Sequence, residues 1–396
     1  MSQSLMTALR ASAAHLPESL IVKAFKHGFG KPGLIPLWAG EGDIPTPAFI
    51  CEAASAALTR GETFYMPNRG IPPLREAIAR YHTRLFGRSF SADEFFVTGG
   101  GMQAVQLAVQ MIAGAGDEVV VPGPAWPNFR GALECNGAKA VTVPMSFGRN
   151  GWQLDLDALF RSVTPRTKAI VINSPSNPTG WTASEAELRA ILDFTRAKGL
   201  WIIADEIYMR FFYGADGKPG GLAPSFQTLR TTTDRIVFAQ TFSKNWAMTG
   251  WRIGWLQAPA ELGQVIENLV QYNTSGVAPF MQAGAIAALE DGETFATDQI
   301  ARAAEGRRIV TAALAANNAA RYVPPQGAFY AFFGVDGFDD SLDVTFRMID
   351  EANVGLAPGV AFGPEGAAFL RLCFLRDPVQ VADAMSRVSG WLKTAK

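Results

Sequence analysis

Lys244 is the residue whose type and surroundings point most directly to covalent chemistry. It lies in TFSKNWAMTGWRIGW (Thr241–Trp255), just after a strand-like apolar run, with Thr241 and Ser243 beside it and Arg252 further along. A partly desolvated lysine near a second cation has a lowered pKa, which favours attack on a carbonyl and a Schiff base. The hydroxyls and the guanidinium could bind a phosphate dianion. The alternative interpretation is an ordinary surface lysine.

A carboxylate follows a second apolar run. LWIIADEIYMRF (Leu200–Phe211) places Asp205 at the carboxyl end of a predicted strand, where open α/β sheets bind ligands. An aspartate there can pair with a protonated pyridine nitrogen, so that the ring accepts electrons from a substrate carbanion. Tyr208 could donate to a phenolate oxygen of the same ring. Glu206 is an alternative functional acid, and a helix N-cap is an alternative role for Asp205.

Three successive glycines open a helix-like segment. In VTGGGMQAVQLAVQMI (Val97–Ile112) a strand ends, Gly99, Gly100 and Gly101 follow, and an amphipathic helix begins. Backbone N–H groups at a helix N-terminus stabilise an anion, so this turn predicts a phosphate site unless it is a plain tight turn. GFGKPG (Gly28–Gly33) also matches a dinucleotide-binding pattern, but no strand precedes it and a proline interrupts it, so we set that interpretation aside.

Two more predicted strand ends carry residues of interest. VINSPSNPTG (Val171–Gly180) is rich in turn formers, and PGPAWPNF (Pro122–Phe129) contains Trp126, whose indole can stack on a flat heteroaromatic ring. A plain turn and core packing are the respective alternatives. Taken together, the five segments favour one ligand that carries a phosphate, an aldehyde, a pyridine nitrogen and a phenolate.

Strand-like and helix-like segments alternate from about residue 50 onward. Runs such as AIVIN and LWIIAD are apolar without alternation, which is typical of strands buried on both faces of a mostly parallel α/β sheet. The predicted strands are Phe95–Thr98, Glu118–Val121, Ala140–Val143, Ala169–Asn173, Trp201–Ala204, Ile236–Gln240 and Arg252–Leu256. The predicted helices include Leu74–Phe86, Met102–Ile112, Glu185–Lys198 and Ala260–Tyr272.

The C-terminal part has a different pattern, which predicts a second domain. In order, it contains a long helix from about Asp291 to Asn318, a strand at Gly327–Phe333, a helix near Val344–Ala352, a strand at Phe369–Phe374 and a helix from Val379. We therefore predict an N-terminal arm (residues 1–47) that packs with a smaller α+β domain (residues 291–396), and a large ligand-binding domain between them (residues 48–290).

Composition narrows the class of protein. Hydrophobic residues make up 48% of the 396 residues, and 35 Lys and Arg balance 36 Asp and Glu, so no basic surface for nucleic acid is expected. No run is long and apolar enough to predict a membrane span. Three widely separated cysteines do not form a disulfide pattern, which favours the cytoplasm. No pair of histidines has metal-ligand spacing, so no metal is expected.

In this order along the chain, the motifs resemble the class I/II aminotransferases of pyridoxal-phosphate fold type I, the group that includes the aspartate aminotransferases. The likeness extends from IPLWAGEGDIPTP (Ile35–Pro47) to FLRLCF (Phe369–Phe374), with NPTG, ADEIY, SK, GWRIG and FLRL in family order. The resemblance implies a mostly parallel seven-stranded sheet flanked by helices, a smaller α+β domain, and pyridoxal 5′-phosphate as the cofactor.

The resemblance also implies roles for individual residues. Lys244 would be the Schiff-base lysine and proton shuttle, Asp205 the partner of the pyridinium, and Arg371 the clamp on the substrate α-carboxylate. Tyr208 and Asn177 would bond the cofactor's 3-oxygen. Trp126 would stack on the ring, and the phosphate would be held by Gly100, Gly101, Met102, Thr241, Ser243 and Arg252. Gly40, through its backbone, and Trp126 and Asn177 would contact the substrate. Tyr65 would reach the phosphate of a neighbouring subunit in a homodimer with shared sites.

The implied reaction moves an amino group between an L-amino acid and a 2-oxo acid in two half-reactions, with ping-pong kinetics. Two departures limit the substrate prediction: Met102 stands where many relatives have a polar residue, and no second arginine suits a side-chain carboxylate. Trp38, Phe25 and Phe280 could make the pocket apolar. A β-lyase or synthase with the same cofactor, or a non-catalytic cofactor-binding protein, are the alternatives.

Overall fold

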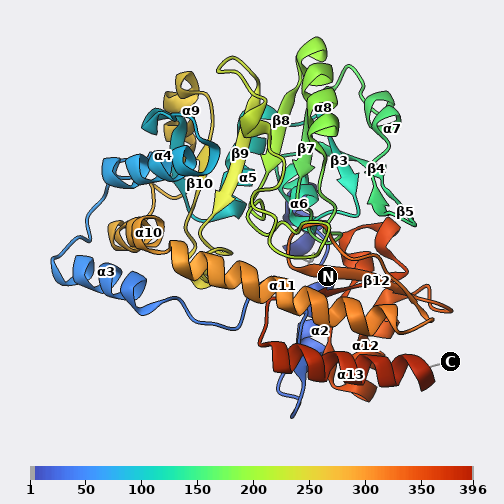
Figure 1. Cartoon of the computed structure of the whole chain (residues 1–396). Coiled ribbons are helices and arrows are strands. Elements are labelled where there is room, and N and C mark those ends of the chain that lie inside the picture. The colour runs from blue at the N-terminus through green and yellow to red at the C-terminus, as the bar shows by residue number, and fades with distance from the viewer. Residues whose placement is uncertain (1–4, 395–396) are drawn as a thin grey trace.

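A seven-stranded sheet forms the centre of the computed structural model, which describes residues 5–394 (Figure 1). Within this sheet β10 is antiparallel to both of its neighbours, and the other pairs are parallel, so the predicted mostly parallel seven-stranded sheet is confirmed. The strand order is β2 (Phe95–Thr98), β10 (Gly254–Gln257), β9 (Ile236–Thr241), β8 (Trp201–Asp205), β7 (Thr167–Asn173), β3 (Glu118–Gly123) and β4 (Lys139–Pro144).

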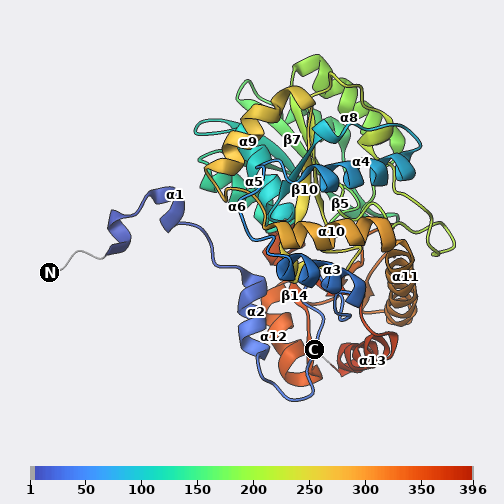
Figure 2. The ribbon, with the colours of Figure 1, turned by 90° about the vertical axis from the view of Figure 1, so that its left-hand side faces the viewer.

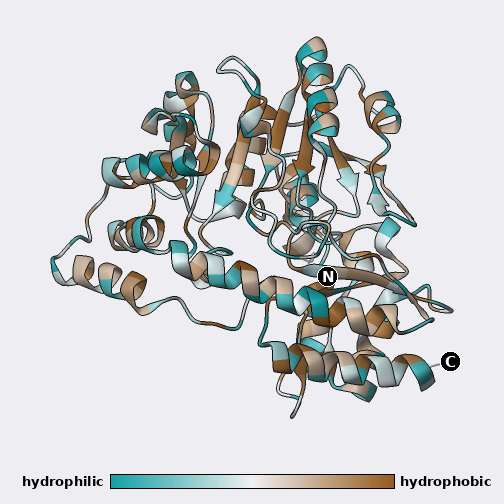
Figure 3. Ribbon diagram, in the orientation of Figure 1, coloured by the Kyte–Doolittle hydropathy of each residue, from teal (hydrophilic) through white to brown (hydrophobic). Residues whose placement is uncertain are grey.

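Both faces of the sheet are covered, which explains its continuous apolar strands. Successive residues of β7 enter two different clusters: Ile170 and Ile172 pack on the side of α7 and α8, and Ala169 and Val171 on the side of α5, α6 and α9. Figure 3 shows the brown strands enclosed by helices whose outer faces are teal. These helices are α5 (Gly101–Ile112), α6 (Pro127–Cys135), α7 (Leu156–Arg161), α8 (Glu185–Lys198) and α9 (Gly263–Gln271).

A third group of helices covers the β2–β10 edge of the sheet. Leu74 and Ile78 of one helix pack with Ala285 of another against Val97 of the edge strand β2 and Trp255 of its neighbour β10. The helices of this group are α3 (Ala48–Thr59), α4 (Pro72–Phe86) and α10 (Pro279–Asp291). Residues 5–394 contain no helix that is both long enough and apolar enough to cross a membrane.

A second, four-stranded antiparallel sheet lies beyond the carboxyl ends of the central strands (Figure 1). Figure 2 shows α2 beside α12, and two short strands also join the N-terminal arm to this part, because β1 pairs in parallel with β13. The boundaries at residues 47 and 290 remain predictions. The elements are β11 (Ala320–Arg321), β12 (Tyr330–Val335), β15 (Phe369–Cys373), β14 (Ala357–Pro358), α2 (Leu20–Gly28), α11 (Glu293–Ala315), α12 (Ser341–Ala352), α13 (Pro378–Thr394), β1 (Ile35–Pro36) and β13 (Val354–Gly355).

The structure corrects several predicted boundaries. Arg252 was expected to begin a strand, but its φ of 52° is left-handed and β10 begins only at Gly254. The long C-terminal helix begins at Glu293 rather than Asp291, because Gly292 separates it from α10. The predicted helix Ala260–Tyr272 starts with a 3₁₀ turn, and its α-helical part is Gly263–Gln271. The hairpin of β5 (Ser146–Gly148) and β6 (Gly151–Gln153) was not predicted.

Candidate active site

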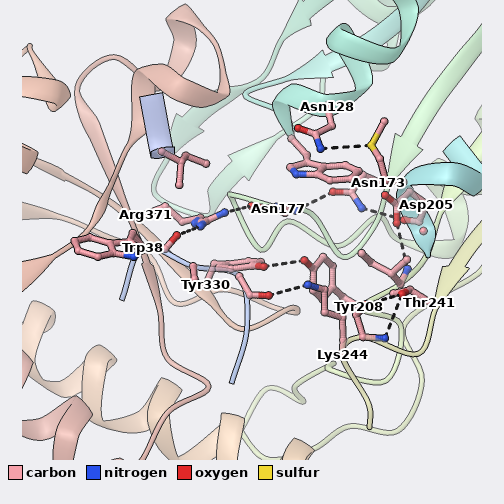
Figure 4. A pocket seen from close by; sticks show the side chains of 18 of the residues that line it. Trp38, Asn128, Asn173, Asn177, Asp205, Tyr208, Thr241, Lys244, Tyr330 and Arg371 are labelled. Carbon is pink, nitrogen blue, oxygen red and sulfur yellow. Dashed lines mark hydrogen bonds between the residues drawn. The ribbon is translucent and has the colours of Figure 1, made fainter. Parts of the chain in front are cut away.

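A cavity of about 400 Å³ opens where the carboxyl ends of the central strands meet the smaller sheet and the arm (Figure 4). It brings together residues that are far apart in the sequence, from Gly40 to Arg371. The predicted site residues that line it are Gly40, Gly101, Met102, Trp126, Asn177, Asp205, Tyr208, Thr241, Ser243, Lys244, Arg252 and Arg371. Gly100 and Tyr65 are the two predicted site residues that do not.

Lys244 and Asp205 face this one cavity from two adjacent strands. Lys244 follows β9, and its Nζ donates to the carbonyl oxygen of Gly40 at 2.7 Å. Burial lowers the pKa of Lys244 to about 8, so about a tenth of the amine is neutral at pH 7 and about half at pH 8. Asp205 ends β8 and is 2% exposed, and burial raises the pKa of its carboxyl to about 7 against the opposing effect of the Lys244 charge.

The Asp205 carboxylate has few protein partners. Among residues 5–394 it accepts one hydrogen bond, from the N–H of Ile207 at 3.3 Å. No helix follows, because residues 207–210 form a turn, so the structure does not contain the alternative of a helix N-cap. Glu206, the alternative functional acid, does not line the cavity, because its carboxylate binds the Ser225 hydroxyl and the Phe226 N–H. A buried carboxylate with one weak partner is therefore available to a ligand.

One end of the cavity suits a phosphate. The first-turn N–H groups of Gly101 and Met102 lack intrahelical acceptors by helix geometry, and Thr241, Ser243 and Arg252 lie at the same end. Two of the three glycine N–H groups that were predicted to bind the anion have partners within the protein. The N–H of Gly100 donates to the carbonyl of Thr98, and that of Gly99 donates to the Gln103 side chain. These two N–H groups are thus occupied.

Gly100 lies close to the Arg252 guanidinium at this end of the cavity. Its φ is +87°, and a Cβ placed on it would lie 2.7 Å from Nη2 of Arg252. A side chain would displace the guanidinium, whose Nη1 donates to the carbonyl of Thr249 at 2.7 Å. The glycine is therefore needed for the close approach of arginine and backbone.

The opposite end of the cavity holds Arg371 of β15, which is 3% exposed. Its Nη1 donates to Oδ1 of Asn177 at 3.0 Å and its Nη2 to the carbonyl of Trp38. Its Nε is buried and has no hydrogen-bond partner among the described residues. Because a buried guanidinium N–H without a partner is costly, this group indicates a place for an anionic ligand.

Tyr330 is a cavity residue that the sequence argument missed. It was assigned only to a strand, yet its hydroxyl lies 2.8 Å from the hydroxyl of Tyr208, and its ring lies 4.6 Å from the guanidinium carbon of Arg371. Burial raises the pKa of Tyr208 well above its ordinary value, so Tyr208 stays protonated and able to donate. A lone tyrosine in an otherwise apolar strand was the available signal. Asn128, Asn173, Ile21 and Trp38 also line the cavity.

Tyr65 lies apart from the cavity described so far. Its side chain is 92% exposed and borders a separate surface hollow formed by residues 63–66 and 274–280. Phe280 lies in that hollow as well, whereas Phe25 packs edge-on against Trp38 at a ring distance of 5.9 Å. Of the three aromatic residues expected around the substrate, Trp38 alone lines the cavity within this chain.

The residues present fit pyridoxal phosphate. An amine of lowered pKa, a buried carboxylate with little protein hydrogen bonding, and an anion-binding turn whose glycine leaves room for Arg252 line one space. Lys244 would hold the aldehyde carbon, Asp205 the pyridine nitrogen, and the Gly101 turn with Thr241, Ser243 and Arg252 the phosphate. Trp126 lines the same cavity and offers an indole face for the ring.

Sequence comparison with known proteins agrees with this assignment of the cavity. The model of the class I and II aminotransferase family matches residues 33–388. A probable aspartate/prephenate aminotransferase of Aquifex aeolicus is 36% identical and aligns over 91% of both chains. The aromatic-amino-acid aminotransferase 2 of Thermococcus litoralis is 34% identical over 96% of both chains.

A solved structure extends the agreement to three dimensions. The aromatic aminotransferase from Pyrococcus horikoshii OT3 has a TM-score of 0.85 and 32% identity, with 94% of this chain and 98% of that one covered. Family, fold and cavity chemistry agree. The chain therefore belongs to the class I and II aminotransferases: it is an aminotransferase of pyridoxal-phosphate fold type I, with pyridoxal 5′-phosphate as its cofactor.

Proposed function

We propose that this aminotransferase moves an amino group between an L-amino acid and a 2-oxo acid by a ping-pong mechanism in which Lys244 is the proton shuttle. The observation that carries the proposal is that Lys244, Asp205 and Arg371 line one cavity. When bound, the cofactor supplies a carbon that carries the amino group and a cationic ring that accepts the electron pair of the substrate Cα–H bond.

Arg371 positions the substrate. Its buried Nε, which has no partner among residues 5–394, and an Nη group can form the two parallel hydrogen bonds that a carboxylate accepts. Asn177 holds the other Nη from the side, at 3.0 Å, and so limits rotation of the guanidinium. Arg371 would thereby bind the α-carboxylate at the end of the cavity opposite the Gly101 turn and hold the substrate within the cavity that Lys244 also lines.

Lys244 moves the proton. A pKa of about 8 makes its neutral amine available as a general base near pH 8, and its protonated form is an acid of matched strength. The amine would take the proton from the substrate Cα and hold it for return to the amino-bearing carbon that the cofactor supplies. Asp205, as a carboxylate, would hold the pyridine nitrogen in its protonated form. Tyr208 would donate to the 3-oxygen.

The decisive test compares Lys244→Ala with Lys198→Ala, an exposed lysine at the end of α8. We expect Lys244→Ala to lose the visible absorption band of the lysine-bound cofactor and to lower the transamination rate by about 10⁴-fold. The Lys198→Ala control should keep both, with parallel double-reciprocal plots for donor and acceptor. A Lys244→Ala variant with near-normal turnover would refute the assignment. Release of pyruvate and ammonia without any acceptor would support β-elimination instead.

A homodimer with shared sites is part of the same proposal. Phe64, Tyr65 and Tyr272 are 79%, 92% and 89% exposed, and such large exposed aromatic side chains are typical of an interface. Light scattering of the holoenzyme should give twice the chain mass. A monomer at micromolar concentration with full activity would contradict the shared site. The cytoplasmic location remains a prediction from cysteine usage.

A further inference from the structure

Several residues of the cavity wall have no role in the reaction proposed above. After the cofactor-facing residues and Arg371 are set aside, the wall includes Ile21, Trp38 and Ala39 from the arm and the side chains of Met102 and Asn128, besides Asn173, Ile207 and Tyr330. The Nδ2 of Asn128 donates to the sulfur of Met102 at 3.4 Å, so the two side chains form one continuous surface. A substrate side chain, which points away from the α-carboxylate clamp, has this wall to contact.

Each positively charged side chain of the cavity already has a partner or an expected role. Within residues 5–394 its lining carries three: Lys244, Arg252 and Arg371. Arg252 lies at the phosphate end and is held by the Thr249 carbonyl, and Arg371 is held by Asn177 and the Trp38 carbonyl. A second carboxylate on a substrate would therefore enter without a cation to pair with, which costs several kcal/mol for a desolvated charge.

Met102, Trp126 and Asn128 also line a second cavity of about 580 Å³. In the described chain its charged lining consists of one guanidinium, Arg130, and three carboxylates, those of Glu18, Glu134 and Glu365. Arg130 is paired with Glu134 at 2.6 Å, and the buried Oε2 of Glu365 has no hydrogen-bond partner among residues 5–394. Glu18 is paired with Lys26 at 2.9 Å, so this second cavity offers no free cation to an acidic side chain.

The face around Tyr65 supplies no cation either. The surface hollow formed by residues 63–66 and 274–280 contains hydroxyl, aliphatic and aromatic side chains, with no charged residue among those that the structure describes. If this face completes the site of a second copy, as in the proposed homodimer, it adds Tyr65 and Phe280 to the substrate region. Both would enlarge its apolar surface.

We infer that the preferred amino donor carries an uncharged, apolar side chain, as in leucine, methionine or phenylalanine, and that Met102 and Asn128 set this specificity. The inference rests on the proposed transamination and deepens it, because it names the substrate class of the same site. Acidic donors are excluded because neither cavity offers a free cation to a second carboxylate.

The test uses the purified holoenzyme and follows the absorbance change of the bound cofactor in single turnovers. L-leucine and L-aspartate are a matched pair, because their side chains have the same branched shape and differ in charge. We expect kcat/KM for leucine to exceed that for aspartate by about 100-fold or more, with phenylalanine at least equal to leucine. An equal or higher value for aspartate, or a higher value for lysine, would overturn the inference and leave the transamination proposal intact. If no amino acid changes the spectrum, the transamination proposal itself fails.

A variant adds a charge at the wall. Asn128 is exposed, so Asn128→Arg should fold normally, and it places a cation beside Met102. We expect the leucine-to-aspartate ratio of kcat/KM to fall by at least about tenfold, while the control Gln264→Arg, at an exposed position of α9 that lines neither cavity, keeps the wild-type ratio. An unchanged ratio in a folded, cofactor-loaded Asn128→Arg enzyme would show that the side chain of the substrate does not reach this wall.

Discussion

Asp205 is the last residue of β8 and Glu206 is the next residue, yet their carboxylates lie in two different regions of the molecule. Burial raises the pKa of each to about 7. The Glu206 carboxylate lies in the protein interior and accepts from the Ser225 hydroxyl at 2.6 Å and the Phe226 N–H at 3.0 Å. The Asp205 carboxylate faces the cavity with one hydrogen bond from Ile207.

The difference teaches that a perturbed pKa does not by itself identify the functional acid. Both groups are desolvated to a similar degree, so their pKa values agree. What separates them is the set of partners, because the protein satisfies Glu206 and leaves Asp205 to a ligand. Glu206 is therefore assigned to stability and Asp205 to the chemistry, and three predictions test this division.

The largest effect is expected for Asp205→Asn, which keeps the shape and removes the charge. Without the carboxylate the cofactor ring loses its cationic form, so kcat/KM should fall on the order of 10³-fold. The cofactor-free protein should respond in the opposite direction, gaining about 2–4 kcal/mol of unfolding free energy at pH 8, because a buried, unpaired charge is removed. Activity assays and urea unfolding of the cofactor-free form measure the two effects. If Asp205→Asn lowers the unfolding free energy as well as the activity, the Asp205 carboxylate stabilises the fold, as that of Glu206 does.

Glu206→Ala should show the reverse pattern. It leaves the Ser225 hydroxyl and the Phe226 N–H without their acceptor, which costs about 2–4 kcal/mol of unfolding free energy at pH 5.5. Turnover of the folded holoenzyme should stay within about threefold of wild type. Glu206→Gln, which retains an acceptor oxygen, is the control and should lose less stability. A 100-fold loss of kcat in Glu206→Gln would restore Glu206 as a candidate acid.

The smallest effect concerns pH. The folded pKa of Asp205 is raised from 3.8 to about 7, so between these values the folded, cofactor-free protein binds more protons than the unfolded chain. The contribution of Asp205 to unfolding free energy therefore falls as pH rises from about 4 to about 7 and is constant above. Subtracting the Asp205→Asn curve from the wild-type curve isolates this group. A difference that is flat with pH would mean that the carboxyl is not desolvated.

The sequence predicts those site residues that follow directly from a strand. Asp205, Lys244 and Asn177 are local to their strand ends, so parallel pairing brings them to one edge of the sheet. The glycine turn was placed correctly, although the N–H groups of Gly99 and Gly100 are bonded within the protein. Such bonds depend on side-chain conformation, which the pattern of residue types does not contain.

Contacts between distant segments were beyond prediction. The hydroxyl pair of Tyr208 and Tyr330 joins residues 122 positions apart, and the bond from Lys244 to Gly40 spans 204 positions. Both depend on how the four-stranded sheet and the arm dock on the central sheet. Periodicity predicted that these elements exist, but not which atoms meet. The left-handed conformation of Arg252 is a similar case, because arginine rarely adopts it and nothing local indicates it.

Gly40 sits where the arm, the catalytic lysine and the tyrosine pair converge. Its carbonyl accepts from Lys244, and a Cβ built on it would lie 2.4 Å from the Tyr330 hydroxyl. Even a single methyl group here would clash with the Tyr330 hydroxyl and disturb its hydrogen bond with Tyr208. A substitution in the arm, outside the cofactor's own contacts, would therefore reach a tyrosine that is expected to hold the cofactor.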